Sequence, residues 1–259
     1  KKMSEIVLTQ EEQKNLKGKK EEAHQLLINK AILEKAKATE LEPMEKKELN
    51  YITETEKAKF YVSKFVRPKV NVSENEIVEV YNANKAFFEN QNIKFEQARA
   101  NISNELFNNR AAQIEADYVK EIVDNMKKDV VLTREDLQFT RGNSDVMKTF
   151  VINKVILEDA KKYNFETEEK AALEIIENNV LLNYYADRSV KDKIRISQQE
   201  IEKIYNENKA NFGQTPVDAA YNQIGNALVG QKATQLKQEL AKQIAKEYNI
   251  DAEVEKYNL

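Results

Sequence analysis

Apolar residues recur every three to four positions along most of the chain, and this spacing predicts α-helices almost throughout. Dense apolar segments predict largely buried helices at residues 21–38 and 145–162. Sparser periodic segments predict helices at residues 43–66 and 167–190. The longest periodic stretches carry, at matching spacing, Phe107, Ala111, Ile114, Tyr118, Ile122 and Met126, and then Val229, Ala233, Leu236, Leu240, Ile244 and Tyr248.

Two short apolar segments, Ile6–Leu8 and Val130–Leu132, precede the first helix of each half and predict a strand or an extended stretch. Helix starts after these segments are marked by Thr9 with Glu12 and by Thr133 with Asp136, a spacing typical of capping boxes. The predicted fold class is all-α, with at most short β-strands at the module edges.

The pattern of apolar and polar positions occurs twice, offset by 124 residues. Residues 26–37 match residues 150–161 at 8 of 12 positions, and residues 73–88 match residues 197–212 at 9 of 16. The chain is therefore predicted to contain two tandem modules, residues 1–129 and 130–259. No Gly-, Ser- or Pro-rich linker separates them, so the seam at Asp129–Leu132 predicts docked rather than loosely tethered modules.

Composition removes several classes of function. The net charge of −3 lacks the basic footprint of a nucleic-acid-binding protein, and no run of 18 apolar residues could span a membrane. The absence of cysteine excludes disulfides and thiolate chemistry, and no phosphate-binding loop implies a nucleotide. The chain opens with Lys1-Lys2-Met3-Ser4 and no apolar segment typical of a signal peptide follows.

The order of these segments resembles the chaperone module of the SurA and PrsA family of exported bacterial foldases. The resemblance rests on VLTQEE and VLTREDL, on LLINKAILEKAK and FVINKVILEDAK, and on SENEIVEVYNANKAFF and SQQEIEKIYNENKANF. It implies a helical chaperone module, present twice, and an exported protein located in the periplasm or at the cell surface.

One departure from the family decides the expected chemistry. Members carry a parvulin prolyl-isomerase domain after the segment that matches Phe88 and Phe212, whereas here only residues 89–92 and 213–215 lead to the next helix. The family's isomerase site contains a pair of histidines, and this chain has one histidine in total. We therefore expect no prolyl-isomerase activity, no enzyme function and no cofactor or metal.

Other candidate sites have simpler explanations. His24 is matched by Lys148, so a partly exposed helix residue is expected there rather than a catalytic or metal-binding group. Acidic pairs such as Glu168-Glu169 alternate with lysines and are typical of a solvated face. The repeated Tyr-Asn-x-Asn-Lys segments at residues 81–85 and 205–209 predict helix C-termini, with Asn and Lys near the last carbonyl groups.

Apolar residues that are polar in the other repeat are the strongest candidates for binding. Phe65 matches Ser189, Phe87 matches Asn211, Met44 matches Glu168, and Phe139 matches Asn15. Such residues do not fill a shared core, so they predict either a contact between modules or an exposed surface that binds a polypeptide. With the matched aromatic pair Phe88 and Phe212, they form the set of candidate client-binding residues.

The sequence thus predicts an ATP-independent chaperone-like protein that holds unfolded, partly folded or nascent exported polypeptides. Two alternatives stay open at this point. One is a dedicated interaction or assembly scaffold that binds one folded partner or a second copy of itself as a homodimer. The other is an enzyme whose all-helical site has no recognisable motif.

Overall fold

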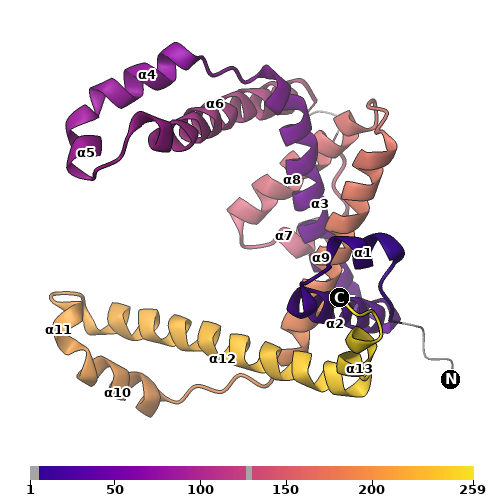
Figure 1. Ribbon diagram of the computed structural model, residues 1–259. Coiled ribbons are helices and arrows are strands. Elements are labelled where there is room, and N and C mark those ends of the chain that lie inside the picture. Colours follow the sequence, from indigo (N-terminus) through magenta and orange to yellow (C-terminus); the bar gives the residue numbers. More distant parts are fainter. Residues whose placement is uncertain (1–5, 127–129) are drawn as a thin grey trace. The chain divides into compact units, whose positions relative to one another are not determined.

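The computed structural model describes residues 6–126 and 130–259, and all regular structure within these ranges is helical (Figure 1). The first repeat contains α1 (Gln10–Asn15), α2 (Lys20–Ala38), α3 (Pro43–Val66), η1 (Arg67–Lys69), α4 (Glu74–Ala83), α5 (Lys85–Asn90) and α6 (Phe95–Met126). The second contains α7 (Arg134–Thr140), α8 (Ser144–Ala160), α9 (Thr167–Lys191), α10 (Gln198–Glu207), α11 (Lys209–Phe212), α12 (Val217–Glu247) and α13 (Ile250–Glu255). The predicted all-α fold class is confirmed.

Local hydrogen bonds begin the helices where the sequence places them. The hydroxyl groups of Thr9 and Thr133 accept from the backbone N–H of the third helical residue, and the acid at that position accepts from the threonine N–H. The Ser73 hydroxyl accepts from the Glu76 N–H at 3.2 Å, and the Ser197 hydroxyl accepts from the Glu200 N–H at 3.1 Å. Each cap satisfies an N–H group that would otherwise have no partner inside the helix.

The repeated Tyr-Asn-x-Asn-Lys segments end helices, as predicted. The Asn84 side-chain amide donates to the Val80 carbonyl at 2.8 Å, and the Asn208 amide donates to the Ile204 carbonyl at 2.9 Å. Helices α4 and α10 stop just before these asparagines. Short helices, α5 and α11, follow each break.

The segments Ile6–Leu8 and Val130–Leu132 are not helical, and neither forms a strand in the part of the chain that the structure describes. Asp129, at the predicted seam, lies outside the described residues. In α2 and α8 only part of the apolar surface is fully buried: Leu27 is 0% exposed, whereas Leu33 and Leu157 are half-buried. The interpretation that these helices are buried on most sides was therefore too broad.

The chain divides into two compact units that do not follow the boundary between the repeats. Unit 1 contains Lys1–Leu41 and Asn178–Leu259, and unit 2 contains Glu42–Glu177. Each unit therefore combines segments of both repeats. Helices α2 and α8 are exchanged between the repeats. In unit 1, α2 of the first repeat packs with α12 and α13 of the second, and in unit 2, α8 of the second repeat packs with α3 and α6 of the first.

The core of unit 1 forms where α2 meets α12 and α13. Leu27 and Ile28 of α2 pack with Ile244 of α12 and with Ile250 and Val254 of α13, all five buried. The Tyr257 hydroxyl accepts from the Leu8 N–H at 2.9 Å, so the C-terminal residues also hold the extended segment before α1.

The core of unit 2 forms where α8 lies against α3 and α6. Ile156 and Ala160 of α8 pack with Ala58, Val62 and Val66 of α3. The hydrophobic contact is joined by polar ones, since the Asn153 amide donates to the Thr55 hydroxyl at 2.8 Å. A separate small cluster holds α4 against the N-terminal part of α6 and is formed by Ile77, Ala98 and Ile102.

This division predicts which fragments fold. A fragment of residues 42–177 keeps α8 with α3 and α6, and we expect it to unfold cooperatively in urea with a helical circular-dichroism spectrum. A fragment of residues 1–129 keeps α3 and α6 without α8 and exposes that core, so a non-cooperative transition is expected. Cooperative unfolding of residues 1–129 and of 130–259, with none of residues 42–177, would contradict the division.

Candidate functional site

Each unit carries a helical arm made by a short pair of helices that lies along the N-terminal part of a long helix. In unit 2 the arm consists of α4 and α5 against α6, and in unit 1 it consists of α10 and α11 against α12 (Figure 1). The pairs follow from the asparagine breaks described above, which let the chain turn after α4 and α10. Aromatic side chains gather at the turn of each arm.

The arm of unit 2 ends in an aromatic cluster with one exposed ring. Tyr81 and Phe88 stack with ring centroids 4.9 Å apart, and Phe95 meets Tyr81 edge to face at 5.3 Å. The Phe87 ring lies 5.5 Å from that of Phe88, and 58% of the residue surface of Phe87 is exposed. Phe88 is thus part of the small core of the arm, whereas Phe87 presents an apolar ring to solvent.

The arm of unit 1 lacks the exposed ring. Its cluster contains Tyr205, Phe212 and Tyr221, with Tyr205 lying 5.6 Å from Phe212 and 5.3 Å from Tyr221. Asn211, which matches Phe87, is exposed. The two arms therefore differ at their tips by one large apolar side chain.

Phe65 belongs to a second aromatic cluster inside unit 2. Its ring stacks on Tyr118 at 5.0 Å and lies 5.9 Å from Tyr61 and 6.5 Å from Tyr163. Tyr163 comes from the second repeat, so Phe65 lies at a contact between repeats and is half-buried. Phe65 therefore corresponds to the module-contact alternative rather than to a free surface.

A carboxylate links the same cluster to α8. The hydroxyl groups of Tyr61 and Tyr118 both donate to Asp159 Oδ2, at 2.8 Å and 3.1 Å. Burial raises the pKa of both phenols, and the Asp159 carboxylate raises it further. Sequence reasoning missed this group, although Asp159 is matched by Lys35, and that charge difference was a visible signal.

Phe139 and Met44 have different surroundings. Phe139 is half-buried, with its ring 5.5 Å from Tyr51 of the first repeat and 6.2 Å from Phe150. Phe139 thus joins Phe65 at a contact between repeats. Met44, near the start of α3, is 52% exposed. Of the four candidates Phe65, Phe87, Met44 and Phe139, Met44 and Phe87 face solvent.

The position of Phe65 gives a stability prediction. Phe65→Ser removes a ring that packs on three tyrosines, so we expect the variant to lose about 2–4 kcal/mol of unfolding free energy in urea titrations. Phe87→Asn removes an exposed ring and should change that free energy by less than about 0.5 kcal/mol. Equal losses for the two variants would contradict the assignment of Phe65 to packing.

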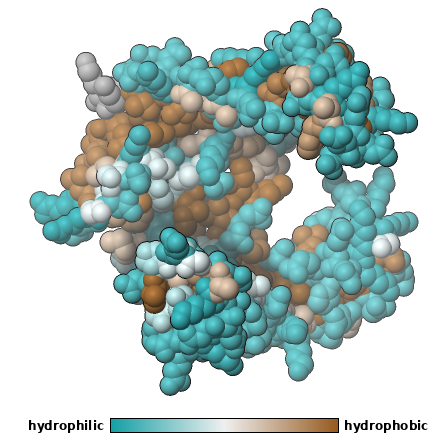
Figure 2. Space-filling model, turned by 90° about the vertical axis from the view of Figure 1, so that its left-hand side faces the viewer, coloured by the Kyte–Doolittle hydropathy of each residue, from teal (hydrophilic) through white to brown (hydrophobic). Residues whose placement is uncertain are grey.

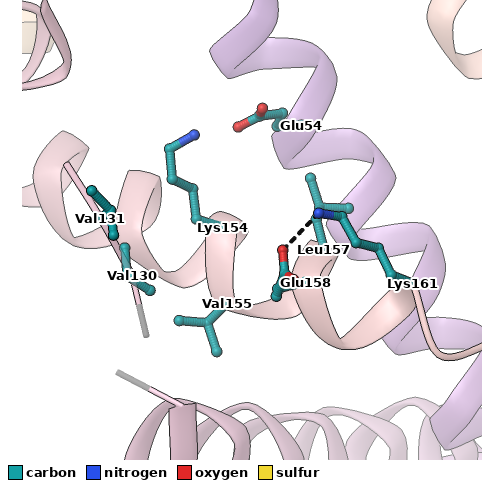
Figure 3. A pocket seen from close by; sticks show the side chains of 8 residues that line it. All are labelled: Glu54, Val130, Val131, Lys154, Val155, Leu157, Glu158 and Lys161. Carbon is teal, nitrogen blue, oxygen red and sulfur yellow. Dashed lines mark hydrogen bonds and ion pairs between the residues drawn. The ribbon is translucent and has the colours of Figure 1, made fainter. Parts of the chain in front are cut away.

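A pocket of about 290 Å³ opens in unit 2 beside α8 (Figure 3). Valine side chains from the extended segment lie on one side, and residues of α8 lie on the other (Figure 3). Its lining residues are Glu54, Val130, Val131, Lys154, Val155, Leu157, Glu158 and Lys161. The lining combines four aliphatic side chains with two acids and two lysines.

The lysine beside the pocket, Lys154, has a different partner from its counterpart Lys30 in the first repeat. In unit 1, Lys30 Nζ donates to the Val7 carbonyl at 2.9 Å and to Glu12 Oε1 at 2.5 Å. The matching Lys154 of unit 2 instead lies 4.7 Å from the centre of the Phe150 ring. Asp136, which matches Glu12, pairs with Lys47 of α3 at 2.5 Å. The extended segment in unit 2 is therefore not tied to α8 by its lysine.

The Asp136 pair gives a pH prediction. Burial by itself raises the pKa of Asp136, but hydrogen bonds from Lys47, the Thr133 N–H and the Thr133 hydroxyl outweigh it and hold the pKa below its usual value. The stability from this pair is present above the unfolded-state pKa of about 3.9 and is lost as the pH falls through the lower folded-state value.

We expect Asp136→Asn to lower the unfolding free energy by about 1–3 kcal/mol at pH 7 and to flatten its decline between pH 5 and pH 2. Urea titrations across this range measure both effects. Glu12 contributes a decline of the same sign because its pKa is also lowered, so Glu12→Gln serves as the matched variant in unit 1. An unchanged acid slope in Asp136→Asn would contradict the assignment.

The remaining candidates of the sequence have structural partners or form no site. His24 Nε2 lies 2.6 Å from Asp251 Oδ1 on the surface of unit 1. Among the described residues, no three His, Asp or Glu side chains gather as they would around a metal ion. Within the same ranges, no helix combines the length and the hydrophobicity of a membrane span. Figure 2 shows hydrophilic residues over most of one face, with hydrophobic patches between them.

Comparisons of the chain with protein-family models, with curated proteins and with solved structures find no match. The resemblance to the SurA and PrsA chaperone module therefore stays a prediction from the sequence.

Proposed function

We propose that the protein is an ATP-independent chaperone-like protein that binds unfolded or partly folded polypeptides without isomerising proline. The observation that carries the proposal is the exposed ring of Phe87 on an arm whose own core is already complete without it. Among the aromatic rings of the described residues, that of Phe87 meets only the ring of Phe88, edge to face. It leaves 58% of the residue surface exposed, and this exposure suits contact with another polypeptide.

The proposal includes an origin by tandem duplication of a SurA- and PrsA-type module. The order of helices supports it, since α1 to α6 and α7 to α12 follow one another with similar lengths. Helices α6 and α12 contain 32 and 31 residues, and helices α3 and α9 contain 24 and 25. In keeping with that resemblance, the proposal includes export to the periplasm or the cell surface, with nascent exported polypeptides as the clients.

The binding mechanism follows from small apolar surfaces within a highly charged exterior. Phe87, Met44 and Ile175 each expose more than half of their residue surface, at 58%, 52% and 59%. Each can bury part of one client side chain, which gives weak contact at about 25 cal/mol per Å². Several weak contacts along one unfolded chain add avidity, and folding of the client removes the segments that bind.

The proposal is tested by aggregation suppression with several unrelated unfolded proteins. The wild-type chain should suppress aggregation of most of them without nucleotide. Phe87→Asn, which copies the other arm, should weaken suppression at least threefold in the concentration needed, with an unchanged melting temperature. Asn211→Phe, which places a ring on the arm of unit 1, should strengthen suppression and is the matched variant.

Two outcomes would contradict the proposal. Suppression of none of the substrates, together with binding of a single folded partner or dimer formation, would instead support the dedicated scaffold. Unchanged suppression by Phe87→Asn would remove the arm of unit 2 from the binding surface.

A further inference from the structure

Among the residues that the structure describes, unit 1 contains a helix without a counterpart in unit 2. The short C-terminal helix α13 packs Ile250 and Val254 onto Leu27 and Ala23 of α2, and all four residues are buried. Surface ion pairs fix its direction, with Asp251 Oδ1 2.6 Å from His24 Nε2 and Glu255 Oε1 3.4 Å from Lys20 Nζ. Tyr257 and Leu259 then pack beside Leu8.

The repeat explains why unit 2 lacks such a helix. The first repeat's long helix ends at Met126, and the extended segment that begins the second repeat follows at Val130. In the second repeat, α12 ends at Glu247 and residues 250–259 follow. The chain between the repeats is therefore too short to supply an α13 for α8.

The face of α8 that matches the α13-binding face of α2 is correspondingly less covered. Val151 matches Leu27 and Met147 matches Ala23, and both are half-buried where their counterparts are 0% exposed. Leu132 is half-buried whereas Leu8 is 4% exposed, and Val131 is 81% exposed. We call Val131, Leu132, Met147 and Val151 the open face of unit 2. Val155, one turn along α8 from Val151, is 0% exposed and lies beside the pocket of Figure 3.

The charge of the open face matches that of α13. Lys148 occupies the position of His24, the residue that pairs with Asp251 in unit 1. Lys154 lies six residues further along α8, and neither ammonium group forms an ion pair within the described ranges. The helix α13 carries three acidic residues, Asp251, Glu253 and Glu255. A helix with an acid at the position of Asp251 would therefore meet the ammonium group of Lys148.

We propose that the open face of unit 2 binds an acidic amphipathic helix of another polypeptide in the way that α2 binds α13. The bound helix presents two aliphatic residues four positions apart to Met147 and Val151, and an acid one residue after the first of them to Lys148. An aliphatic or aromatic side chain that follows the helix packs on Val131 and Leu132. This inference rests on the proposed function and names the surface and the client structure that serve it.

A helix suits this face because aliphatic residues four positions apart lie on one side of a helix, as Ile250 and Val254 do. Such a short segment is unfolded in isolation, so its binding includes the cost of helix formation. Affinity for a single site is consequently weak, in keeping with a client that must be released.

The probe is a fluorescent peptide with the chain's own residues 249–259, NIDAEVEKYNL, titrated with the full chain and followed by anisotropy. Saturable binding is expected, because the tethered α13 keeps the face of unit 1 occupied while the open face is free. Val151→Asp should weaken binding at least tenfold. Val78→Asp, which changes an exposed aliphatic residue of α4 in the same unit, should leave binding within twofold of wild type.

A reversal of charge on both partners tests which residue of the bound helix lies against Lys148. Lys148→Glu should weaken the peptide about threefold to fivefold, as expected for an exposed ion pair, and a peptide with Lys in place of the Asp251 residue should recover the loss. Lys148 is exposed, so this variant stays informative even if Val151→Asp lowers the helicity measured by circular dichroism.

The proposal is overturned if the full chain does not bind the peptide, or if Val151→Asp and Lys148→Glu bind it as the wild type does. It is also overturned if sedimentation shows a dimer that both Val151→Asp and removal of residues 249–259 dissociate, since α13 of a second copy is then the occupant. Peptide binding without any suppression of aggregation would leave this site intact and contradict only the proposed chaperone function.

Discussion

The packing of α8 against α3 and α6 is the contact on which the rest of unit 2 depends. Its buried side chains, Ile156 and Ala160, fill the space between two helices that belong to the other repeat. Polar contacts at Asn153 and Asp159 specify this partner in addition to the hydrophobic area. The exchange of α2 and α8 between the repeats therefore determines which surfaces are buried and which remain available for binding.

Much of the local structure could be predicted from the sequence. The capping residues Thr9, Thr133, Ser73 and Ser197 begin helices, and the spacing of apolar residues gives the extent of α3 and α9 to within one residue. These features depend on neighbours within one turn, and such neighbours are visible in the sequence. The helix end at Asn84 was also predicted, whereas the short helix α5 that follows it was not.

The spatial partners of the helices could not be predicted in the same way. Repeats with nearly the same apolar pattern offer similar faces, so α8 could pack with the helices of either repeat. Residues that are apolar in one repeat and polar in the other indicated some of these contacts. Phe65 and Phe139 lie at contacts between repeats, and Phe87 and Met44 are exposed. Two explanations of this group were open from the sequence, a contact between repeats and an exposed binding surface, and the structure divides its members between them. The open face of unit 2 was not visible, because Val151 and Met147 are apolar in both repeats.

The differences between the two halves arise from few changes on a shared pattern of helices. One ring distinguishes the two arms, one ion-pair partner opens the pocket beside α8, and one C-terminal helix covers α2 alone. A protein built from two similar halves can thus keep one half closed for stability while the other exposes apolar groups. This economy suits a binding protein, since binding surfaces and core residues make opposite demands on burial.

The most direct measurement of the exchanged packing is disulfide formation between paired cysteines, which the cysteine-free chain allows without background. The Thr55 hydroxyl and the Asn153 amide lie 2.8 Å apart, so Thr55→Cys with Asn153→Cys should cross-link rapidly within a monomer under mild oxidation. Asn29 is the counterpart of Asn153 in the first repeat, and Thr55→Cys with Asn29→Cys is the matched pair. Rapid cross-linking of the first pair and slow cross-linking of the second is the predicted result. The reverse order would show that α3 packs with the helix of its own repeat, and it would contradict the account.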